Sequence, residues 1–493
     1  MRESVVIIGA GLGGLSAAIR LAHAGFRVTI LEKQDKPGGK LQRIEKDGYR
    51  FDRGPSTITM PHLFEQVFEH VGRRMGDYVT MHRLEAATRN IFADGHVVDL
   101  TSSYEATMSQ IAEYSPEDAA AFPAFREEAM RLYQLAEERF LGKLMLRFRD
   151  KLSPQMAAGF MRVKPFTTLQ QLLLRYFRHP NTLAMFGRYA TYVGSSPYLS
   201  PAIFAMLAHV ESDLGIYRVE GGTYSIVEAF VQLARELGVT IHTDTAVHEI
   251  VVMNGKVTGV ESSAGSIPAD LVLANGDVLS IYDKLIPPAH RPSVPNRQIE
   301  RYEPSLSGFV QLIGVQRSYS QLLHHTVYYP ERYEAEFRQI FTELRPPEDP
   351  AIYICNGAVS EPGSAPPGGS SLFILVNAPY LSTRWDWEQE EDRYGDLILS
   401  KLESRGLPGL RQAEVRIGYT PSKLQADTFA HRGSIYGISS NSARQTFFRP
   451  VNRSRDIEGL WFVGGTTHPG GGTPIVTQSG QLVAQHVIEQ YGT

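Results

Sequence analysis

The sequence predicts an α/β protein whose centre is a Rossmann-like dinucleotide-binding domain. Three observations lead to this prediction: a glycine-rich turn between a strand and a helix near the N-terminus, a similar turn near the C-terminus, and a return of strand–helix alternation in mid-chain. Because these segments are far apart in a chain of 493 residues, we expect a discontinuous domain interrupted by insertions.

The first glycine-rich turn follows residues 5–8, a run of Val and Ile typical of a strand buried on both faces. The next six residues match G-x-G-x-x-G. Gly9 permits a tight turn, Gly11 lets the backbone approach a pyrophosphate, and Gly14 lets the following helix pack against the strand. Strand, turn and helix in this order predict a nucleotide site rather than an ordinary turn.

The segment after the turn supplies the carboxylate that such a site needs. A helix is expected from Leu15 to a stop at Gly25, followed by a strand over residues 27–31 that ends at Glu32. Glu32 lies near the spacing, roughly 20 residues, of a carboxylate that binds a ribose hydroxyl. That carboxylate disfavours the 2′-phosphate of NADP, whereas the turn alone fits both NAD and FAD.

A second glycine pair favours FAD. Residues 37–40 read Pro-Gly-Gly-Lys, and Gly54, Pro55 and Ser56 follow shortly after. This pattern resembles the second glycine pair of two-dinucleotide-domain flavoproteins, in which it extends the FAD site along the diphosphate and ribityl chain.

Composition narrows the function further. The net charge of −4 offers no reason to expect nucleic acid as a partner, and Cys355 is the only cysteine, so no internal disulfide or Cys-based metal cluster is expected. No signal peptide and no apolar run long enough to span a bilayer is present, which suits the cytosol. Neither the pair His324 and His325 nor His468 has metal-ligand spacing with another residue, so no metal is expected.

Residues 139–178 depart from the nearly even balance of basic and acidic residues in the whole chain. They combine Lys and Arg with many apolar side chains and a single acid, Asp150. On helices, this alternation suits peripheral attachment to the anionic inner face of a membrane. The equally weighted alternative is a helical layer of the substrate domain whose apolar stripe is core.

The pattern along the chain predicts five segments. The FAD-binding domain is expected to comprise residues 1–85, 219–298 and 446–493, interrupted by a largely helical substrate- and membrane-facing insertion (86–218) and a substrate-binding domain (299–445). The middle segment contains a helix over 225–237, a hairpin around Asn254 and Gly255, and a buried strand over 269–275.

The C-terminal turn joins a strand, 459–463, to a helix. Glycines at 470–472 precede Thr473, expected to cap the helix, and Pro474, suited to its first turn. A helix N-terminus carries partial positive charge, and reduced flavin carries negative charge near N1 and O2, so we expect the isoalloxazine ring here.

Several motifs together resemble the carotenoid desaturases and oxygenases, FAD-dependent relatives of the amine oxidases. They are the N-terminal fingerprint, GPSTITMP (54–61), YVGSSPYLSPAIFAM (192–206), VEGG (219–222), RGSIYG (432–437) and FVGGTTHPGGGTPIVTQSGQ (462–481). The C-terminal motif, EPSLSGFVQLIGV (303–315) and LLHHTVYY (322–329) resemble most closely the branch of 4,4′-diaponeurosporene and 4,4′-diapolycopene oxygenases. One departure from other flavoproteins is Gly465, where many have an Asp that binds ribityl or diphosphate; carotenoid desaturases commonly lack it too.

The resemblance implies an FAD site, a hydrophobic carotenoid substrate and a fold of the two-dinucleotide-domain type with an inserted α+β substrate domain and a helical membrane-facing part. It implies oxidation of a terminal methyl group of a C30 carotenoid to an aldehyde. The alternatives are a desaturase of the phytoene or diapophytoene type, a flavin-dependent isomerase or carotenoid-binding carrier, and an NAD(P)H-dependent reductase. Neither the electron acceptor nor a catalytic acid or base is assigned. The residues expected to bind FAD are Gly9, Gly11, Gly14, Glu32, Gly39, Lys40, Gly54, Pro55, Ser56, Val247, Asn275, Gly464, Gly465, Gly471, Gly472, Thr473, Pro474 and Ile475.

Overall fold

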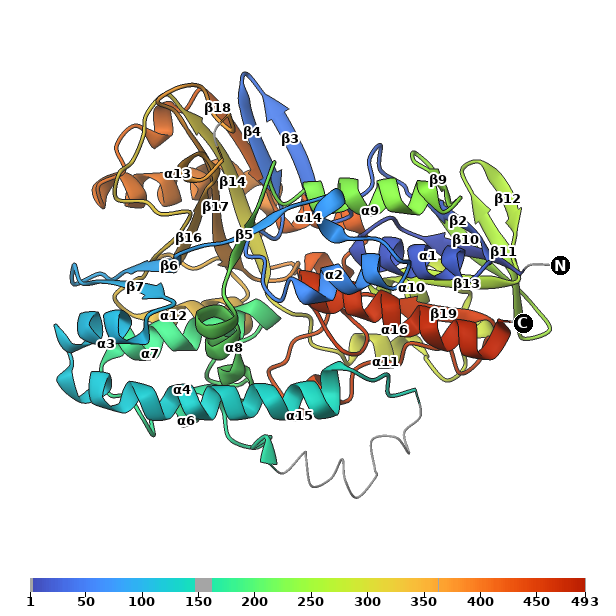
Figure 1. Ribbon diagram of the computed structural model, residues 1–493, viewed down its shortest axis with the longest axis horizontal. Helices are drawn as coiled ribbons and strands as arrows, with labels where there is room; N and C mark the ends of the chain where they lie inside the picture. The colour runs from blue at the N-terminus through green and yellow to red at the C-terminus, as the bar shows by residue number, and fades with distance from the viewer. Residues whose placement is uncertain (1–2, 147–161, 362, 493) are drawn as a thin grey trace.

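A parallel sheet and a mixed sheet organise the chain, with a helical layer beneath the mixed one (Figure 1). The structure is a computed structural model, and it describes residues 3–146, 162–361 and 363–492.

The parallel sheet has five strands in the order β19-β13-β1-β2-β9. The N-terminal segment supplies two of them, the middle segment two, and the C-terminal segment one, so strands from three distant parts of the chain form one sheet. All four pairings are parallel. The strands are β1 (Ser4–Ile8), β2 (Arg27–Leu31), β9 (Thr240–His242), β13 (Leu271–Asn275) and β19 (Leu460–Val463).

Both faces of this sheet are covered, which explains the continuous Val and Ile runs. Val5 and Ile7 of β1 pack in one core with the helices on their side, whereas Val6 packs in another core on the opposite face. The helices on the first side are α1 (Leu12–His23), α2 (His62–Glu69), α9 (Ser225–Glu236) and α16 (Thr473–Tyr491). The second side carries β10 (Val247–Met253), β11 (Lys256–Ser262), β12 (Gly265–Pro268) and α10 (Val278–Leu285).

The mixed sheet has seven strands in the order β18-β14-β17-β16-β15-β6-β7. All of its pairings are antiparallel except β15 with β6, which is parallel. Its strands are β18 (Val415–Tyr419), β14 (Ser307–Val315), β17 (Ser370–Ala378), β16 (Ile352–Asn356), β15 (His325–Tyr328), β6 (Ala86–Ile91) and β7 (Val97–Thr101).

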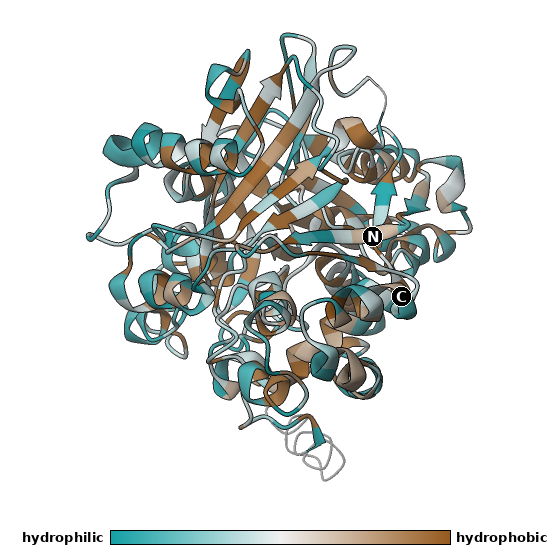
Figure 2. Ribbon diagram, turned by 90° about the vertical axis from the view of Figure 1, so that its left-hand side faces the viewer, coloured by the Kyte–Doolittle hydropathy of each residue, from teal (hydrophilic) through white to brown (hydrophobic). Residues whose placement is uncertain are grey.

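Alternate residues of this sheet face two different environments. Ile313, Ile374 and Ile354 pack in a core with α13 (Trp387–Ser404). The intervening residues, such as Val310 and Leu375, line a cavity on the opposite face. Figure 2 shows these strands largely brown in the interior, whereas the outer helices carry teal.

The helical layer lies below the mixed sheet in Figure 1. It is built from α3 (Tyr104–Ala112), α4 (Pro116–Ala136), α6 (Leu169–Leu173), α7 (Pro180–Gly187) and α8 (Met206–His209), with short 3-10 and π turns such as η2 (Glu137–Leu141), η4 (Arg188–Val193), η5 (Ala202–Ala205) and η6 (Val210–Leu214). Among the described residues, none of the helices is both long and apolar enough to cross a membrane. Part of the basic, apolar stretch 139–178 lies outside the described residues.

The segment expected to be a largely helical insertion begins with β6 and β7, which extend the mixed sheet, and the helical layer follows. One expectation needs correction. Thr473 is not the N-cap of α16: Gly472 holds that position, with φ 104° and no capping side chain, and Thr473 is the first helical residue. A glycine tolerates the positive φ that a threonine would resist.

The remaining elements connect these layers. They are the hairpin β3 (Gln42–Lys46) and β4 (Tyr49–Arg53), the pair β5 (Met81–Arg83) and β8 (Tyr217–Val219), η1 (Met75–Asp77), η7 (Pro288–His290), α11 (Asn296–Glu300), α12 (Tyr333–Arg338), η8 (Gln339–Glu343), η9 (Gly357–Val359), η10 (Leu410–Gln412), α14 (Pro421–Thr428), η11 (His431–Gly433) and α15 (Ala443–Phe447).

Candidate functional site

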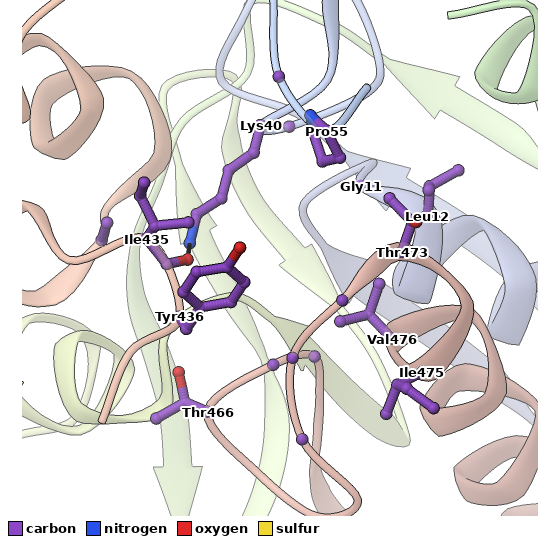
Figure 3. A pocket seen from close by; sticks show the side chains of 18 of the residues that line it. Gly11, Leu12, Lys40, Pro55, Ile435, Tyr436, Thr466, Thr473, Ile475 and Val476 are labelled. Carbon is purple, nitrogen blue, oxygen red and sulfur yellow. Dashed lines mark hydrogen bonds between the residues drawn. The ribbon is translucent and has the colours of Figure 1, made fainter. Parts of the chain in front are cut away.

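A single cavity of about 860 Å³ joins the parallel sheet to the cavity face of the mixed sheet. Every residue expected to bind the cofactor lines it except Gly14. Figure 3 shows Gly11 and Leu12 of the N-terminal turn, Lys40 and Pro55 of the second glycine segment, and Thr473 and Val476 of α16 around the same space. The two remote glycine turns therefore meet, while their contacts with a cofactor stay a prediction.

The N-terminal turn needs its glycines for close backbone approach. Gly9 has φ 93°, and a Cβ on it would lie 2.6 Å from the carbonyl oxygen of Asn275. A Cβ on Gly14 would lie 2.4 Å from the carbonyl oxygen of Gly9, so Gly14 serves packing behind the turn and does not face the cavity. The Asn275 amide holds the turn from the neighbouring strand by donating to the Gly9 carbonyl at 3.0 Å.

Glu32 braces the same turn. Its Oε2 accepts a hydrogen bond from the backbone N–H of Ala10 at 2.7 Å, and its Oε1 accepts from that of Gln34 at 3.0 Å. The side chain is buried and lines the cavity. Each carboxylate oxygen accepts more than one hydrogen bond, so Glu32 retains capacity for a ribose hydroxyl.

Lys40 is the charged side chain of the second glycine segment. Its Nζ donates to the carbonyl oxygen of Ile435, drawn as a dashed line in Figure 3. Burial lowers the pKa of Lys40, and the nearby Asp277 carboxylate partly opposes that shift. In the same segment, Gly54 has φ 140°, and a Cβ there would lie 2.4 Å from the Lys40 carbonyl oxygen.

The C-terminal turn brings a helix N-terminus and two polar side chains to the cavity. Tyr436 covers Gly471 so closely that a Cβ there would lie 2.9 Å from its ring. Arg449 donates to the Gly465 carbonyl and to Ser440 Oγ, both at 3.1 Å, and burial lowers its pKa to about 10. Sequence reasoning missed both as site residues: the motif RGSIYG (432–437), which contains Tyr436, served only for the family resemblance, and no motif marks Arg449.

These features fit FAD. Glu32 and Gly11 suit the adenosine and diphosphate, because the carboxylate faces the cavity and a side chain on Gly11 would fall 3.1 Å from Asn275. The N-termini of α1 and α16 present free N–H groups to negative charge. Gly471, Gly472 and Thr473 line the part of the cavity where the flavin ring is expected.

The far half of the cavity is apolar. The mixed sheet contributes the side chains that point away from α13, and the helical layer faces them from below. The lining includes Val310, Val327, Phe373 and Leu375 from the sheet, and Tyr133, Phe140, Leu141, Ile203, Phe204, Met206, Leu207 and Val210 from the helical layer.

A buried polar cluster interrupts this apolar lining. Arg188 Nη1 donates to the Tyr192 hydroxyl at 2.7 Å, and Arg188 Nη2 lies 3.5 Å from Glu211 Oε1. Thr88 Oγ1 also donates to Glu211 Oε1, at 2.7 Å. Close by, the Tyr333 hydroxyl is buried without a hydrogen-bond partner among the described residues, and burial raises its pKa well above the usual value.

Three further polar residues have structural partners. Ser195 Oγ accepts from the Ser440 N–H at 2.7 Å, and the backbone N–H of His431 donates to Asp277 at 3.2 Å. His468 lines the cavity, and its Nε2 lies 2.7 Å from the carbonyl oxygen of Phe140. His324 and His325, which lacked metal-ligand spacing in the sequence, come together with Cys355, their possible ligand atoms within 4.8 Å of one another.

Comparison with known proteins matches residues 12–488 to a family described as flavin containing amine oxidoreductase. A 4,4′-diapolycopene oxygenase from a Methylomonas species is 37% identical over 494 residues, covering 99% of this chain and 98% of that protein. A 4,4′-diaponeurosporene oxygenase from Staphylococcus haemolyticus is 34% identical over 490 residues, covering 99% and 97%.

Solved structures share the fold at low sequence identity. An oxidoreductase from Methanosarcina mazei has a TM-score of 0.63 at 17% identity, with 98% of this chain and 100% of that chain covered. Cyclohexylamine oxidase from Brevibacterium oxydans has a TM-score of 0.62 at 16% identity, with 99% of each chain covered.

Proposed function

The chain belongs to the flavin-containing amine oxidoreductase family and is an FAD-dependent oxidoreductase, and from that premise we propose that it oxidises the terminal methyl group of a C30 carotenoid, 4,4′-diaponeurosporene or 4,4′-diapolycopene, to an aldehyde. The observation that carries the proposal is the continuity of the cavity, which runs from both glycine turns into an apolar half.

A polyene hydrocarbon has no charge and no polar group by which a protein could hold it. Burial of apolar surface supplies about 25 cal/mol per Å² and needs no directional contact. Phe373, Leu375 and Val310 on the sheet, opposed by Phe204 and Leu207 of the helical layer, provide such a surface. Their packing also excludes water and sets how far along the cavity the polyene extends.

FAD, when bound, would supply the two-electron oxidation of an allylic C–H bond. Conversion of a methyl group to an aldehyde takes two such oxidations and one oxygen atom from water or dioxygen, and an acceptor such as dioxygen must reoxidise the flavin after each. Cavity-lining residues of this chain would hold it: Glu32 at the ribose, Gly11 at the diphosphate, and Gly471 to Thr473 at the ring. The N-terminus of α16, which lies at the cavity, would favour negative charge on the ring.

The polar lining favours an oxygenase over a desaturase. A desaturase converts one hydrocarbon to another, and its pocket gains nothing from buried polar groups. The Tyr333 hydroxyl is buried at the apolar half without a partner among the described residues, and it can donate to an aldehyde oxygen. The polar cluster of Arg188, Tyr192 and Glu211 lies in the same lining.

The decisive experiment is product analysis. The chain is expressed in a host that makes 4,4′-diaponeurosporene, and the carotenoids are identified by liquid chromatography and mass spectrometry. An aldehyde supports the proposal. Additional conjugated double bonds without oxygen indicate the desaturase, and an unchanged or isomerised carotenoid indicates the isomerase or carrier.

A matched pair of variants links the product to the apolar half. Leu375→Trp fills the cavity from β17, so we expect product formation to fall at least tenfold. Leu397→Trp makes the same change at a 36% exposed position on α13 and should retain activity. Equal activity of the two variants would show that the apolar half of the cavity does not bind the substrate.

We further propose that the chain attaches peripherally to an anionic membrane surface on the cytoplasmic side, which would deliver so insoluble a substrate. Support comes from the basic and apolar segment 139–178: Phe166 is 78% exposed, while Phe140 and Leu141 line the cavity. Exposed apolar and cationic groups together favour the headgroup region of anionic bilayers.

Co-sedimentation with vesicles tests this attachment. We expect binding to phosphatidylglycerol vesicles, weaker binding to phosphatidylcholine, and a further loss in Phe166→Ser. Met253→Ser, at a 61% exposed position on the distant strand β10, is the control. Equal binding to both lipids, or no effect of Phe166→Ser, contradicts attachment through this segment.

A further inference from the structure

Two histidines and the only cysteine of the sequence meet beside the lining of the cavity. His325 of β15 lies directly opposite Cys355 of β16 in the antiparallel pair, so both side chains project from the same face. Val327 and Tyr353, the next pair on this face, line the cavity. The cluster therefore sits on the cavity face of the sheet, one pair of residues beyond the lining.

Hydrogen bonds orient both imidazole rings. His325 Nδ1 lies 2.7 Å from the Tyr353 hydroxyl, which lies 2.6 Å from Ser56 Oγ in the second glycine segment. His324 Nδ1 is hydrogen-bonded to Ser360 Oγ. In both rings Nδ1 is occupied, and Nε2 is the nitrogen left to bind something else.

One nitrogen of each imidazole and the thiol sulfur lie within 4.8 Å of one another. His324 Nε2 lies 3.5 Å from Cys355 Sγ. His325 is 1% exposed, and its Nε2 has no hydrogen-bond partner among the described residues. Bonds of about 2.3 Å to sulfur and 2.0 Å to nitrogen place these two ligand atoms roughly 3.5 Å apart around a tetrahedral Zn²⁺. The observed separation of Cys355 Sγ and His324 Nε2, which is also that of a thiol–imidazole hydrogen bond, matches the spacing of two ligands on one ion.

We propose that His324, His325 and Cys355 form a binding site for a divalent cation of the Zn²⁺ class, with three protein ligands and one open position. The ligand types suit a borderline-soft metal rather than Mg²⁺ or Ca²⁺. Ser360 and Tyr353 act as the outer hydrogen-bond partners that hold metal-binding imidazoles in position.

Two arginines lie near the cluster, and each has an acidic partner. Arg188, near His325, lies 3.5 Å from Glu211, and Arg218, near His324, pairs with Glu361 at 2.6 Å. Each arginine charge is therefore offset by a carboxylate. The thiol loses its proton when the metal binds.

Metal binding is measured on the FAD-loaded protein after chelator treatment and dialysis against Zn²⁺. We expect one equivalent of Zn²⁺ per chain, lost in Cys355→Ser and in His325→Asn. Ser360→Ala should weaken binding about 10- to 100-fold, as removal of an outer partner does. His82→Asn, at a partly exposed position on β5, is the control and should bind normally. FAD content verifies that each variant is folded.

Two results overturn the proposal: absence of stoichiometric Zn²⁺ in the wild-type chain, or equal Zn²⁺ in the wild type and both ligand variants, which shows adventitious surface binding. If a ligand variant fails to fold, Co²⁺ binding to the wild-type chain is measured instead by absorption spectroscopy. Because Cys355 is the only thiol, a thiolate-to-cobalt absorption band in the difference spectrum requires this site, and its absence refutes it. Neither readout depends on carotenoid oxidation.

Discussion

Substitution of Gly480 by alanine tests how the two glycine turns are held together. Gly480 lies where α16 crosses α1, side by side in Figure 1. A Cβ there would lie 2.2 Å from the Gly13 carbonyl oxygen and 3.0 Å from the Ala17 nitrogen. Both are backbone atoms, so no side chain can move aside. Because ordinary contacts begin near 3.5 Å, the helices must separate by roughly 1 Å.

The N-terminal glycine turn leads into α1 and the C-terminal turn leads into α16. Separation of the two helices therefore also moves the two turns apart and changes the cofactor site. Two hydrogen bonds across the contact, from Ser16 Oγ to the Thr477 carbonyl and from Gln481 Nε2 to the Ser16 carbonyl, are both 2.8 Å and would lengthen. Overpacking of this kind costs about 1–3 kcal/mol. If binding FAD requires the original spacing, Gly480→Ala weakens FAD affinity roughly 5- to 150-fold.

The assay is titration of the apoprotein with FAD, followed by quenching of flavin fluorescence. Gly76→Ala is the matched control, since Gly76 lies in the exposed turn η1 and a Cβ there meets nothing within 4 Å. A folded Gly480→Ala protein with the affinity of Gly76→Ala would refute the idea that this helix contact sets the cofactor site.

Three further outcomes are expected. Glu32→Gln replaces one acceptor oxygen by a donor and loses a charge-assisted hydrogen bond of about 1.5–3 kcal/mol, so FAD affinity falls at least tenfold in the same titration. Arg188→Met leaves the Glu211 charge buried without its partner and should lower the free energy of unfolding, measured in urea, by about 3–5 kcal/mol. Adding Glu211→Leu to this variant should restore most of that loss. Equal losses in the single and the double variant contradict a buried ion pair. Burial raises the pKa of Glu336 to about 7, and Asp349 adds to the shift, so the folded state favours the protonated acid. The stability that Glu336 contributes is complete below pH ~4.5 and is lost as pH rises to ~7. The thermal midpoint should therefore fall across this window in the wild type and fall less in Glu336→Gln.

Local patterns in the sequence account for the cofactor half of the cavity. The turn from Gly9 to Gly14 carries its signature in neighbouring residues: Gly9 has a positive φ, and Gly14 packs against the Gly9 carbonyl oxygen. The hairpin at Asn254 and Gly255 is similar, since both residues have the positive φ that such a turn requires. Motifs of this kind are readable because their physics is contained within a few residues.

Local sequence patterns did not predict the apolar, substrate-binding half of the cavity. Its lining depends on which face of a strand points inward and on which strands become neighbours, and neither is set locally. Cys355 became a partner of His325 only through the register of β15 and β16, and β6 and β7 joined the mixed sheet across a parallel pairing with β15. Sequence reasoning therefore named the cofactor turns and missed Arg188, Glu211 and Tyr333.

The division of the cavity has a consequence for specificity. A polar link joins the second glycine segment to the sheet, from Ser56 to the Tyr353 hydroxyl. Nearby, the Tyr436 N–H donates at 2.9 Å to Ser305 Oγ, two residues before β14. The position of the polyene relative to the flavin thus depends on the sheet face and on these links, while the redox chemistry belongs to the cofactor. A change between methyl oxidation and internal desaturation is then expected from side chains such as Leu375 or Phe373, which alter how far the substrate enters, and not from the glycine turns.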